Sequence, residues 1–226
     1  MPDLFNTILI FAIPVVLAIT LHEAAHGYAA KALGDPTAYL LGRVSLNPLR
    51  HIDLIGTIAM PIGILLLTQE LTQGQFLYGW AKPVPVQFGR LRNPKRDMIP
   101  VAFAGPAMNF VQAFVWGLLM LALIGFGLEE TVAYKICQAG ILANLIIFCF
   151  NLLPLPPLDG GRVLVGLAPT RLAIQISRIE PFGIWIVLAL LLTGVLGTYW
   201  MLPAMEFSRT ILQLLLMPFS WLLPVP

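Results

Sequence analysis

Long apolar runs alternate with short polar stretches along the chain, and several of these runs are close to the length of a membrane-spanning helix. An α-helix needs about 20 apolar residues to cross the hydrocarbon core of a bilayer. Runs near this length predict helical spans at residues 4–33, 99–127, 132–153 and 181–202. The pattern therefore predicts an α-helical polytopic membrane protein.

Two further apolar stretches are less regular. Residues 52–67 are interrupted by glycine and proline and form either a short span or a re-entrant segment. Residues 206–223 carry Arg209 and Gln213 and are either interfacial or inserted in the membrane. With these two stretches, the expected total is about five to six membrane segments.

The stretches between the first spans predict turns and extended chain. Gly34 is expected to cap the first helix, because Pro36 follows it and cannot continue a helix. Residues 38–49 and 79–86 contain glycine or proline beside β-branched and aromatic residues, which predicts short membrane-associated β-strands or extended segments.

The composition supports a membrane location. Of the 226 residues, 58% are hydrophobic and 11% are charged, a charged fraction too low to cover a soluble globule of this size. We expect one integral-membrane domain over residues 1–226, with a catalytic core at about 4–165 and C-terminal helices at about 181–223. The first span lacks a basic leader, so no cleaved signal peptide is expected. The net charge of +2 is too small to indicate a nucleic-acid partner, and the lipid bilayer is the expected environment.

Basic residues in the short loops predict the orientation. Residues 72–98 form the loop richest in lysine and arginine, and Arg162, Arg171 and Arg178 add a second basic region. Because basic loops remain on the cytoplasmic side, both regions are expected there. The expected location is the bacterial inner membrane, with the active site opening toward the cytoplasm.

The first predicted span contains the pattern H-E-x-x-H. On a helix, His22 and His26 lie on the same face with Cβ atoms about 5–6 Å apart, close enough for both imidazoles to bind one Zn²⁺ ion. Glu23 projects about 100° around the helix and suits a general base. The alternative is a set of packed or water-facing polar residues, but such a set is costly to desolvate in a membrane helix.

A catalytic zinc usually has three protein ligands, and Asp159 is the best candidate for the third. Pro154, Pro156 and Pro157 must unwind the helix just before it, and unwound backbone at membrane depth is tolerated only inside the protein or beside a wet cavity. The alternative is that Asp159 only caps the following helix.

Other potential metal ligands have weaker settings. His51 lies in a loop between charged residues and can simply be interfacial. Cys137 and Cys149 lie twelve residues apart on one predicted helix, so about 18 Å separates them along its axis and they cannot pair within that helix. We expect both cysteines to be packed thiols.

At these residues the chain resembles the site-2 proteases, zinc metalloproteases that cut within the membrane. His22 to His26 match the first motif of that family, and residues 151–160 match its N-x-x-P-x-P-x-x-D-G motif. The likeness extends to Ala104-Gly-Pro106 with Asn109, and so covers residues 4 to about 165. No PDZ or CBS domain interrupts this region, which is similar to the compact forms of the family.

The resemblance implies a role for each matched residue. His22, His26 and Asp159 would bind one zinc ion per chain in a three-helix core, and Glu23 would be the general base and acid. Asn151 and Asn109 would position the substrate or the oxyanion.

The expected function is zinc-dependent hydrolysis of peptide bonds in transmembrane protein or peptide substrates. The alternative is a membrane ion or zinc transporter, because intramembrane His, Asp and Glu residues also line ion pathways. A transporter predicts several metal sites and broken helices in matching halves of the chain, and the sequence shows one broken helix and no internal repeat. A catalytically inactive scaffold is disfavoured by the intact Glu23.

Sharing one metal also constrains the topology. The histidines lie toward the C-terminal end of the first span and Asp159 follows residues 132–153, so both ends must lie on one side at similar depth. Residues 52–71 are therefore expected either to re-enter on the cytoplasmic side or to cross with a compensating return within residues 68–98.

Overall fold

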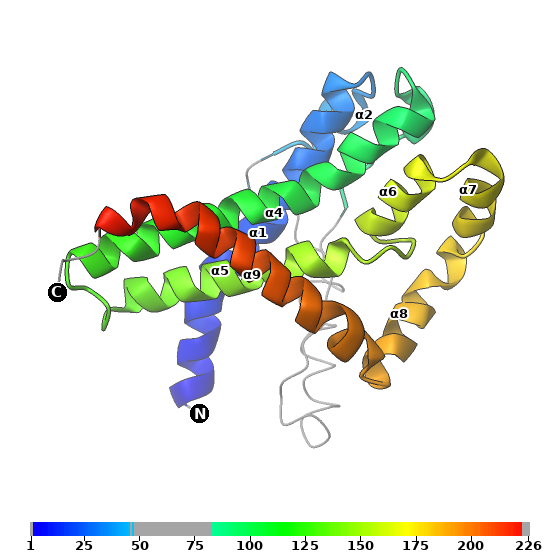
Figure 1. Cartoon of the computed structure of the whole chain (residues 1–226). Helices are drawn as coiled ribbons and strands as arrows, with labels where there is room; N and C mark the ends of the chain where they lie inside the picture. The colour runs from blue at the N-terminus through cyan, green and yellow to red at the C-terminus, as the bar shows by residue number, and fades with distance from the viewer. Residues whose placement is uncertain (1, 46, 48–82, 223–226) are drawn as a thin grey trace.

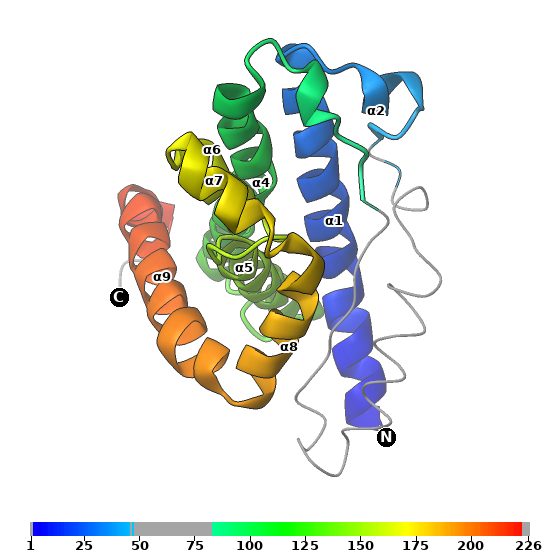
Figure 2. The same cartoon turned by 90° about the vertical axis from the view of Figure 1, so that its right-hand side faces the viewer.

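The computed structural model describes residues 2–45, 47 and 83–222, and these are largely helical. Three long helices, α1 (Pro2–Ala32), α4 (Pro94–Gly125) and α5 (Val132–Asn151), pack against one another, and α6 (Asp159–Leu167) packs on α4 (Figure 1 and Figure 2). The remaining described elements are α2 (Thr37–Leu40), η3 (Phe88–Arg90), α7 (Thr170–Ser177), η4 (Glu180–Phe182), α8 (Gly183–Leu192), η5 (Gly197–Met201), α9 (Leu202–Leu216) and η6 (Met217–Leu222).

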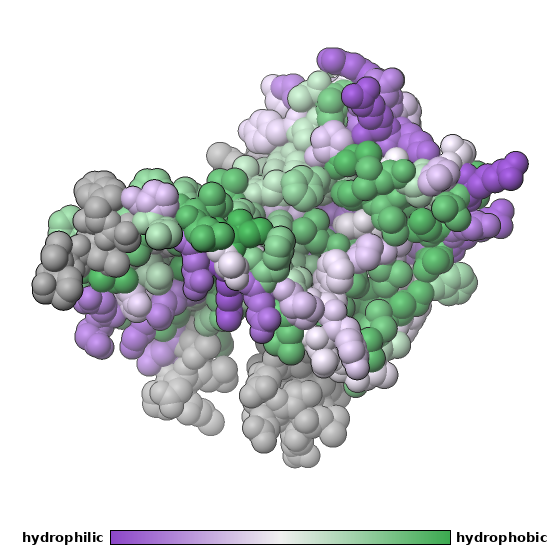
Figure 3. Space-filling model, viewed as in Figure 1, coloured by the Kyte–Doolittle hydropathy of each residue, from purple (hydrophilic) through white to green (hydrophobic). Residues whose placement is uncertain are grey.

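Four helical stretches are long and apolar enough to cross a bilayer. Many large apolar side chains on these helices are exposed, as expected for surfaces that face lipid, and Figure 3 shows apolar residues over much of one face, with hydrophilic residues gathered where α1 ends and α4 begins. The chain is a membrane protein. The four stretches are Ile8–Ala32, Pro94–Gly125, Val132–Asn151 and Thr170–Leu192, and the first three match predicted spans.

The C-terminal end of α1 and the start of α4 are joined directly. The backbone N–H of Arg92 donates to the carbonyl of Leu33 across 3.0 Å. Gly34 has a φ of 112°, which ends α1 as the sequence predicts. Pro94 occupies the first turn of α4, where a missing N–H costs no helical hydrogen bond. The histidine-bearing half of α1 therefore lies beside the N-terminal half of α4.

The predicted break after α5 is confirmed. The helix ends at Asn151, and a new helix begins at Asp159 after the proline-containing turn. Gly160 and Gly161 pack directly on this turn, since a Cβ on Gly160 would lie 2.2 Å from the Leu152 carbonyl oxygen and one on Gly161 would lie 2.2 Å from the Pro156 nitrogen. The two glycines thus allow α6 to fold back closely against the unwound segment.

The predicted single span at 181–202 is wrong. Helix α8 ends at Leu192, and Gly194 adopts a φ of 73°, a left-handed conformation that turns the chain. The crossing-length stretch is instead Thr170–Leu192. Predicted segment 206–223 corresponds largely to α9 and η6, and α9 packs on α4 and α5 through a cluster formed by Ala113, Leu145 and Leu212.

The predicted strands are not found in the part of the chain that the structure describes. Over 38–49, the chain instead begins with α2, because Asp35 Oδ1 accepts the N–H of Thr37 at 3.0 Å and starts a helical turn that Gly42 ends with a φ of 63°. Within 79–86, residues 83–86 are extended without strand pairing. Several expectations concern residues outside the described ranges. They are the role of His51, the membrane placement of residues 52–67 and 52–71, and the part of the predicted return within 68–98 that precedes residue 83.

Candidate metal centre

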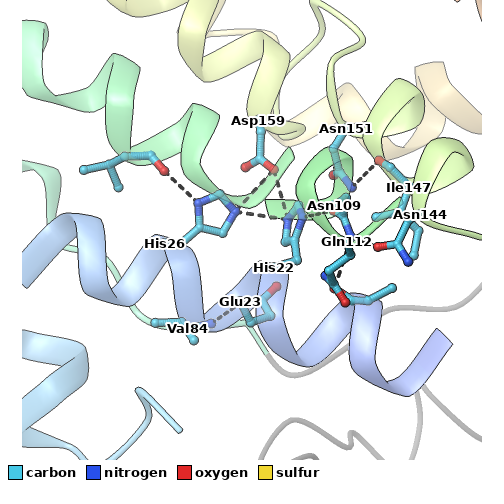
Figure 4. Close-up of polar contacts among 12 residues, drawn as sticks. His22, Glu23, His26, Val84, Asn109, Gln112, Asn144, Ile147, Asn151 and Asp159 are labelled. Carbon is cyan, nitrogen blue, oxygen red and sulfur yellow. Dashed lines mark hydrogen bonds and ion pairs between the residues drawn. The ribbon is translucent and has the colours of Figure 1, made fainter. Parts of the chain in front are cut away.

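Three side-chain atoms from two helices converge in the protein interior. The Nε2 atoms of His22 and His26 are 3.1 Å apart, and Asp159 Oδ2 lies 3.2 Å from the first and 3.3 Å from the second (Figure 4). All three residues are buried. Ligands at zinc-like distances of about 2.0–2.1 Å around a tetrahedral ion are about 3.3–3.4 Å apart. The triangle of atoms therefore has nearly the dimensions of one face of a zinc site.

The hydrogen bonds of the other ring nitrogens determine the histidine tautomers. His26 Nδ1 lies 2.7 Å from the backbone carbonyl of Val101, which can only accept, so Nδ1 carries the proton. His22 Nδ1 lies 2.6 Å from Asn109 Oδ1, which also accepts. Each Nε2 then presents a lone pair to the centre, which is the form in which imidazole binds a metal.

This donor set fits a divalent cation. Two Nε2 lone pairs and a carboxylate oxygen facing one another at 3.1–3.3 Å repel unless a positive charge lies between them. Two imidazoles and one carboxylate are also a ligand set that zinc uses in hydrolytic enzymes, with a further position left for water. Among the residues that the structure describes, no other group of three histidine, cysteine or acidic side chains converges in this way.

Helix α4 approaches the histidines closely at Gly105. A Cβ placed there would lie 2.3 Å from His26 Nε2 and 2.6 Å from His22 Nε2. Even an alanine side chain would therefore displace the rings. The adjacent Pro106 is fully buried, so the Gly-Pro pair noted in the sequence packs directly behind the centre.

A cavity of about 190 Å³ opens beside His22, His26 and Asp159. Glu23 reaches this cavity from α1, and its Oε2 accepts the backbone N–H of Val84 at 2.7 Å (Figure 4). Arg162 lines the cavity from α6, with its guanidinium over the Phe88 ring at 5.2 Å and 3.7 Å from Glu180. The other lining residues are His22, His26, Pro83, Val84, Val86, Phe88, Val101, Ala102, Asn151, Pro157, Leu158 and Asp159.

The two predicted substrate-positioning asparagines occupy different places. Asn151 lines the cavity and is partly exposed, and one of its N–H groups donates to the Ile147 carbonyl at 3.0 Å. Asn109 is fully buried behind His22, and its Nδ2 donates to the carbonyl of Ala18 at 3.1 Å and to Asn144 Oδ1 at 3.0 Å. Both N–H groups of Asn109 are thereby occupied within the protein.

His22, Asn109 and Asn144 form a network of hydrogen bonds, and Asn144 is the member that the sequence motifs did not identify. It is fully buried on α5, in a span that is otherwise strongly apolar. A polar amide in such a span is costly unless it has partners, and Asn144 lies two helical turns before Asn151 on the same face. These two signals were present in the sequence.

Asp35 anchors the extended segment that borders the cavity. Its Oδ2 accepts the N–H of Gln87 at 2.6 Å, while Oδ1 accepts from both the backbone and the hydroxyl of Thr37. Burial acts to raise the pKa of Asp35, but these hydrogen bonds and the nearby Arg90 outweigh it and hold the pKa below its usual value. Segment 83–87 is thus held by two carboxylates, those of Glu23 and Asp35.

Taken together, the fold and the centre define a helical membrane metalloprotein. Comparison with known proteins identifies the family. The chain is 35% identical over 202 residues to YwhC of Bacillus subtilis, a candidate zinc metalloprotease, and the match covers 87% of this chain and 86% of YwhC. The chain belongs to the site-2 protease family of zinc metalloproteases, and zinc is its cofactor.

Two mycobacterial proteins, also named as candidate zinc metalloproteases, show further similarity. Rip2 of Mycolicibacterium smegmatis is 25% identical over 191 residues, covering 81% of this chain and 67% of Rip2. Rip3 of Mycobacterium tuberculosis is 42% identical over 77 residues, covering 33% of this chain and 19% of Rip3. No family model and no solved structure matches the chain.

Proposed function

We propose that this zinc metalloprotease is an endopeptidase that hydrolyses peptide bonds of transmembrane substrates within the membrane. The observation that carries the proposal is the position of the triangle of ligand atoms. His22 and His26 lie inside the crossing-length stretch Ile8–Ala32, and the adjoining cavity lies between this helix and the segments around it. A peptide bond that enters the cavity would meet the metal-binding residues among helices that span the bilayer.

In this proposal, His22, His26 and Asp159 hold the zinc ion, and α1, α4, α5 and α6 form the catalytic core. Zinc bound there supplies Lewis-acid polarisation of the scissile carbonyl and lowers the pKa of a water molecule to about 7. Side chains of the protein carry out the remaining steps.

Glu23 is the proposed proton carrier. Its carboxylate lies on the same cavity as the three ligands but contributes none of the converging atoms. It takes a proton from the attacking water and passes it to the nitrogen of the leaving amine. The N–H of Val84 donates to Oε2, which holds the carboxylate in place for both transfers.

The two asparagines have separate proposed roles. Asn151 borders the cavity, and we assign it to the substrate, with its side-chain amide holding the carbonyl oxygen as negative charge develops there. Asn109 is fully buried and both of its N–H groups are occupied within the protein. We therefore propose that Asn109 orients His22 and does not contact the substrate.

A helical substrate must unwind locally before its peptide bond is accessible, because helical carbonyls are bonded within the helix. The extended segment 83–87 borders the cavity through Val84 and Val86. We propose that the unwound substrate lies along this segment as an added strand. Pro83 and Pro85 have no amide N–H, and those of Val84 and Gln87 already donate to Glu23 and Asp35, so the Val86 amide is the informative one. Protection of the Val86 amide from exchange when a substrate peptide binds to Glu23→Gln protein would support this, and unchanged exchange would contradict it.

The proposed setting is a bacterial inner membrane with the cavity on the cytoplasmic side. The basic residues Arg90, Arg92, Lys95 and Arg96 lie at the junction of α1 and α4, beyond the end of the histidine-bearing helix. Basic residues at that end favour the cytoplasmic side.

Purified protein in liposomes with a panel of single-span peptides provides the test. Cleavage at a bond within the apolar part of a peptide, identified by mass spectrometry and absent with Glu23→Gln, is the expected result. Cleavage only in the soluble flanks, or equal cleavage by Glu23→Gln, would contradict the proposal. Zinc flux into the same liposomes without peptide cleavage would instead indicate the transporter alternative.

A further inference from the structure

A chain of side-chain amides connects the interior of α5 to the imidazole of His22. Asn144 Nδ2 donates to the carbonyl of Gly140 at 2.9 Å. Asn109 Nδ2 donates to Asn144 Oδ1 at 3.0 Å, and Asn109 Oδ1 lies 2.6 Å from His22 Nδ1 (Figure 4). The residues come from three helices, α5, α4 and α1, and both asparagines are fully buried.

The direction of every hydrogen bond in this chain is determined by backbone atoms. A carbonyl can only accept, so the Gly140 carbonyl requires the NH₂ group of Asn144 to face it. The oxygen of Asn144 must then face Asn109. The carbonyl of Ala18 fixes the orientation of the Asn109 amide in the same way, since it accepts from Asn109 Nδ2 at 3.1 Å.

The reversed arrangement would be strongly unfavourable. If the amide of Asn109 were flipped, its oxygen would face the carbonyl of Ala18 and the oxygen of Asn144, with no proton between any of these acceptors. In a fully buried site, unpaired acceptors of this kind lose their hydration without replacement. The flipped state would also direct an N–H group at His22 Nδ1 and so favour the opposite tautomer.

We propose that Asn144 is a positioning residue that, through Asn109, sets the tautomer of His22 and so prepares its Nε2 to bind the metal. With Asn144 in place, Asn109 presents an acceptor to Nδ1, the proton of the neutral ring resides on Nδ1, and the lone pair is on Nε2. The inference rests on the proposed role of His22 as a zinc ligand. His26 has no need of such a chain, because its Nδ1 donates directly to the carbonyl of Val101.

The first test uses metal-free Asp159→Ala/His26→Ala protein, because in the unaltered chain Asp159 Oδ2 and His26 Nε2, at 3.2 Å and 3.1 Å from His22 Nε2, would themselves favour a proton on that nitrogen. In metal-free protein with ¹⁵N-labelled histidine, at a pH where the imidazole is neutral, the nitrogen shifts and couplings identify which ring nitrogen of His22 carries the proton. His22→Ala protein assigns the signal. The expected result is a proton on Nδ1, and a His22 ring that carries its proton on Nε2 would overturn the proposal.

The second test is Asn144→Leu, which keeps the number of side-chain heavy atoms and the branch at Cγ but removes the acceptor for Asn109. The expected results are a shift of His22 toward the Nε2–H tautomer and a zinc affinity, measured by chelator competition, that is lower by about 10–100-fold. Cys149→Ala is the matched control, because Cys149 is also buried on α5 and is not part of this network, and it should bind zinc as the original protein does.

The outcomes distinguish this proposal from the proposed function. A folded Asn144→Leu protein with unchanged tautomer and zinc affinity would overturn the role of Asn144 while leaving the zinc site intact. If His22→Ala itself retained full zinc affinity, the assignment of His22 as a ligand would be wrong, and the proposal that rests on it would be overturned too. If Asn144→Leu fails to fold, the tautomer of His22 in the first test still decides.

Discussion

Glu23 Oε2 accepts the backbone N–H of Val84 at 2.7 Å, which links the proposed proton carrier on α1 to the extended segment at the edge of the cavity. The bond has two consequences. It restrains the carboxylate beside His22, His26 and Asp159, and it holds segment 83–87 at the edge of the cavity, where we propose that the substrate binds. In the proposed function, this hydrogen bond therefore connects the proton carrier to the segment that binds the substrate.

Glu23→Gln separates the chemical role of this residue from its structural role. Glutamine can still accept the N–H of Val84 through its carbonyl oxygen, so segment 83–87 should stay in place, but the side chain can no longer take up a proton. Peptide cleavage should fall by about 10²–10⁴-fold while the zinc content stays at one ion per chain. Loss of zinc in this variant would instead place Glu23 among the ligands.

Gly105→Ala tests the close approach of α4 to the histidines. The new Cβ would lie 2.3 Å from His26 Nε2, so the rings must move and zinc affinity should fall by more than about tenfold. Alanine favours a helix over glycine by about 1 kcal/mol, so a loss of helix stability would not explain this result. Gly89→Ala is the control, because a Cβ there meets nothing within 4 Å, and chelator competition on the two variants measures the difference.

Asn151→Ala and Asn151→Asp test whether this side chain acts on the substrate. Both variants remove the amide donor, and aspartate keeps the shape. If Asn151 stabilises developing charge on the carbonyl oxygen, turnover of a cleavable peptide should fall by about 10²–10³-fold with the zinc content unchanged. Turnover equal to that of the original protein in either variant would remove the assigned role.

Asp35→Asn tests the anchor of segment 83–87 and gives a pH signature. Because the folded pKa of Asp35 lies below its usual value, the carboxylate contributes stability that is present above the unfolded pKa of about 3.9 and is lost as the pH falls through the folded pKa. The thermal midpoint of the variant in detergent should lie below that of the original protein from pH 5 to 8.

The difference should then shrink as the pH falls below about 4. Glu129→Gln serves as the control, since Glu129 is exposed in the turn after α4, and its midpoint should follow the original protein throughout. A midpoint for Asp35→Asn that equals the original at neutral pH would show that the carboxylate does not anchor the segment.

The side chains of the candidate metal centre could be predicted from the sequence because the geometry of a helix and of a proline break is local. His22 and His26 are one helical turn apart, and the prolines before Asp159 require the break that the structure shows between α5 and α6. The three-dimensional convergence of Asp159 with the histidines required the packing of α4 and α6 around α1, which no local pattern contains.

The errors have equally local causes. The turn at α2 depends on one side-chain contact, from Asp35 to Thr37, that outweighs the extended character of the residues after it. Gly194 bends the chain where apolar content alone suggested a continuous span. Asn144 differs from these, because its polarity in an apolar span and its position before Asn151 were visible in the sequence, whereas its partner Asn109 lies on another helix and becomes apparent only once the helices are packed.

Zinc K-edge X-ray absorption of the purified protein tests the central assignment most directly, because it reports the atoms bound to the metal. With one zinc per chain, the account predicts two imidazole nitrogens with the remaining ligands oxygen, and Asp159→Ala and His26→Ala should each lose the bound ion. A spectrum with sulfur ligands, which would bring Cys137 or Cys149 into the site, or an unchanged spectrum at full zinc occupancy in Asp159→Ala, would contradict the assignment of His22, His26 and Asp159 as the metal centre.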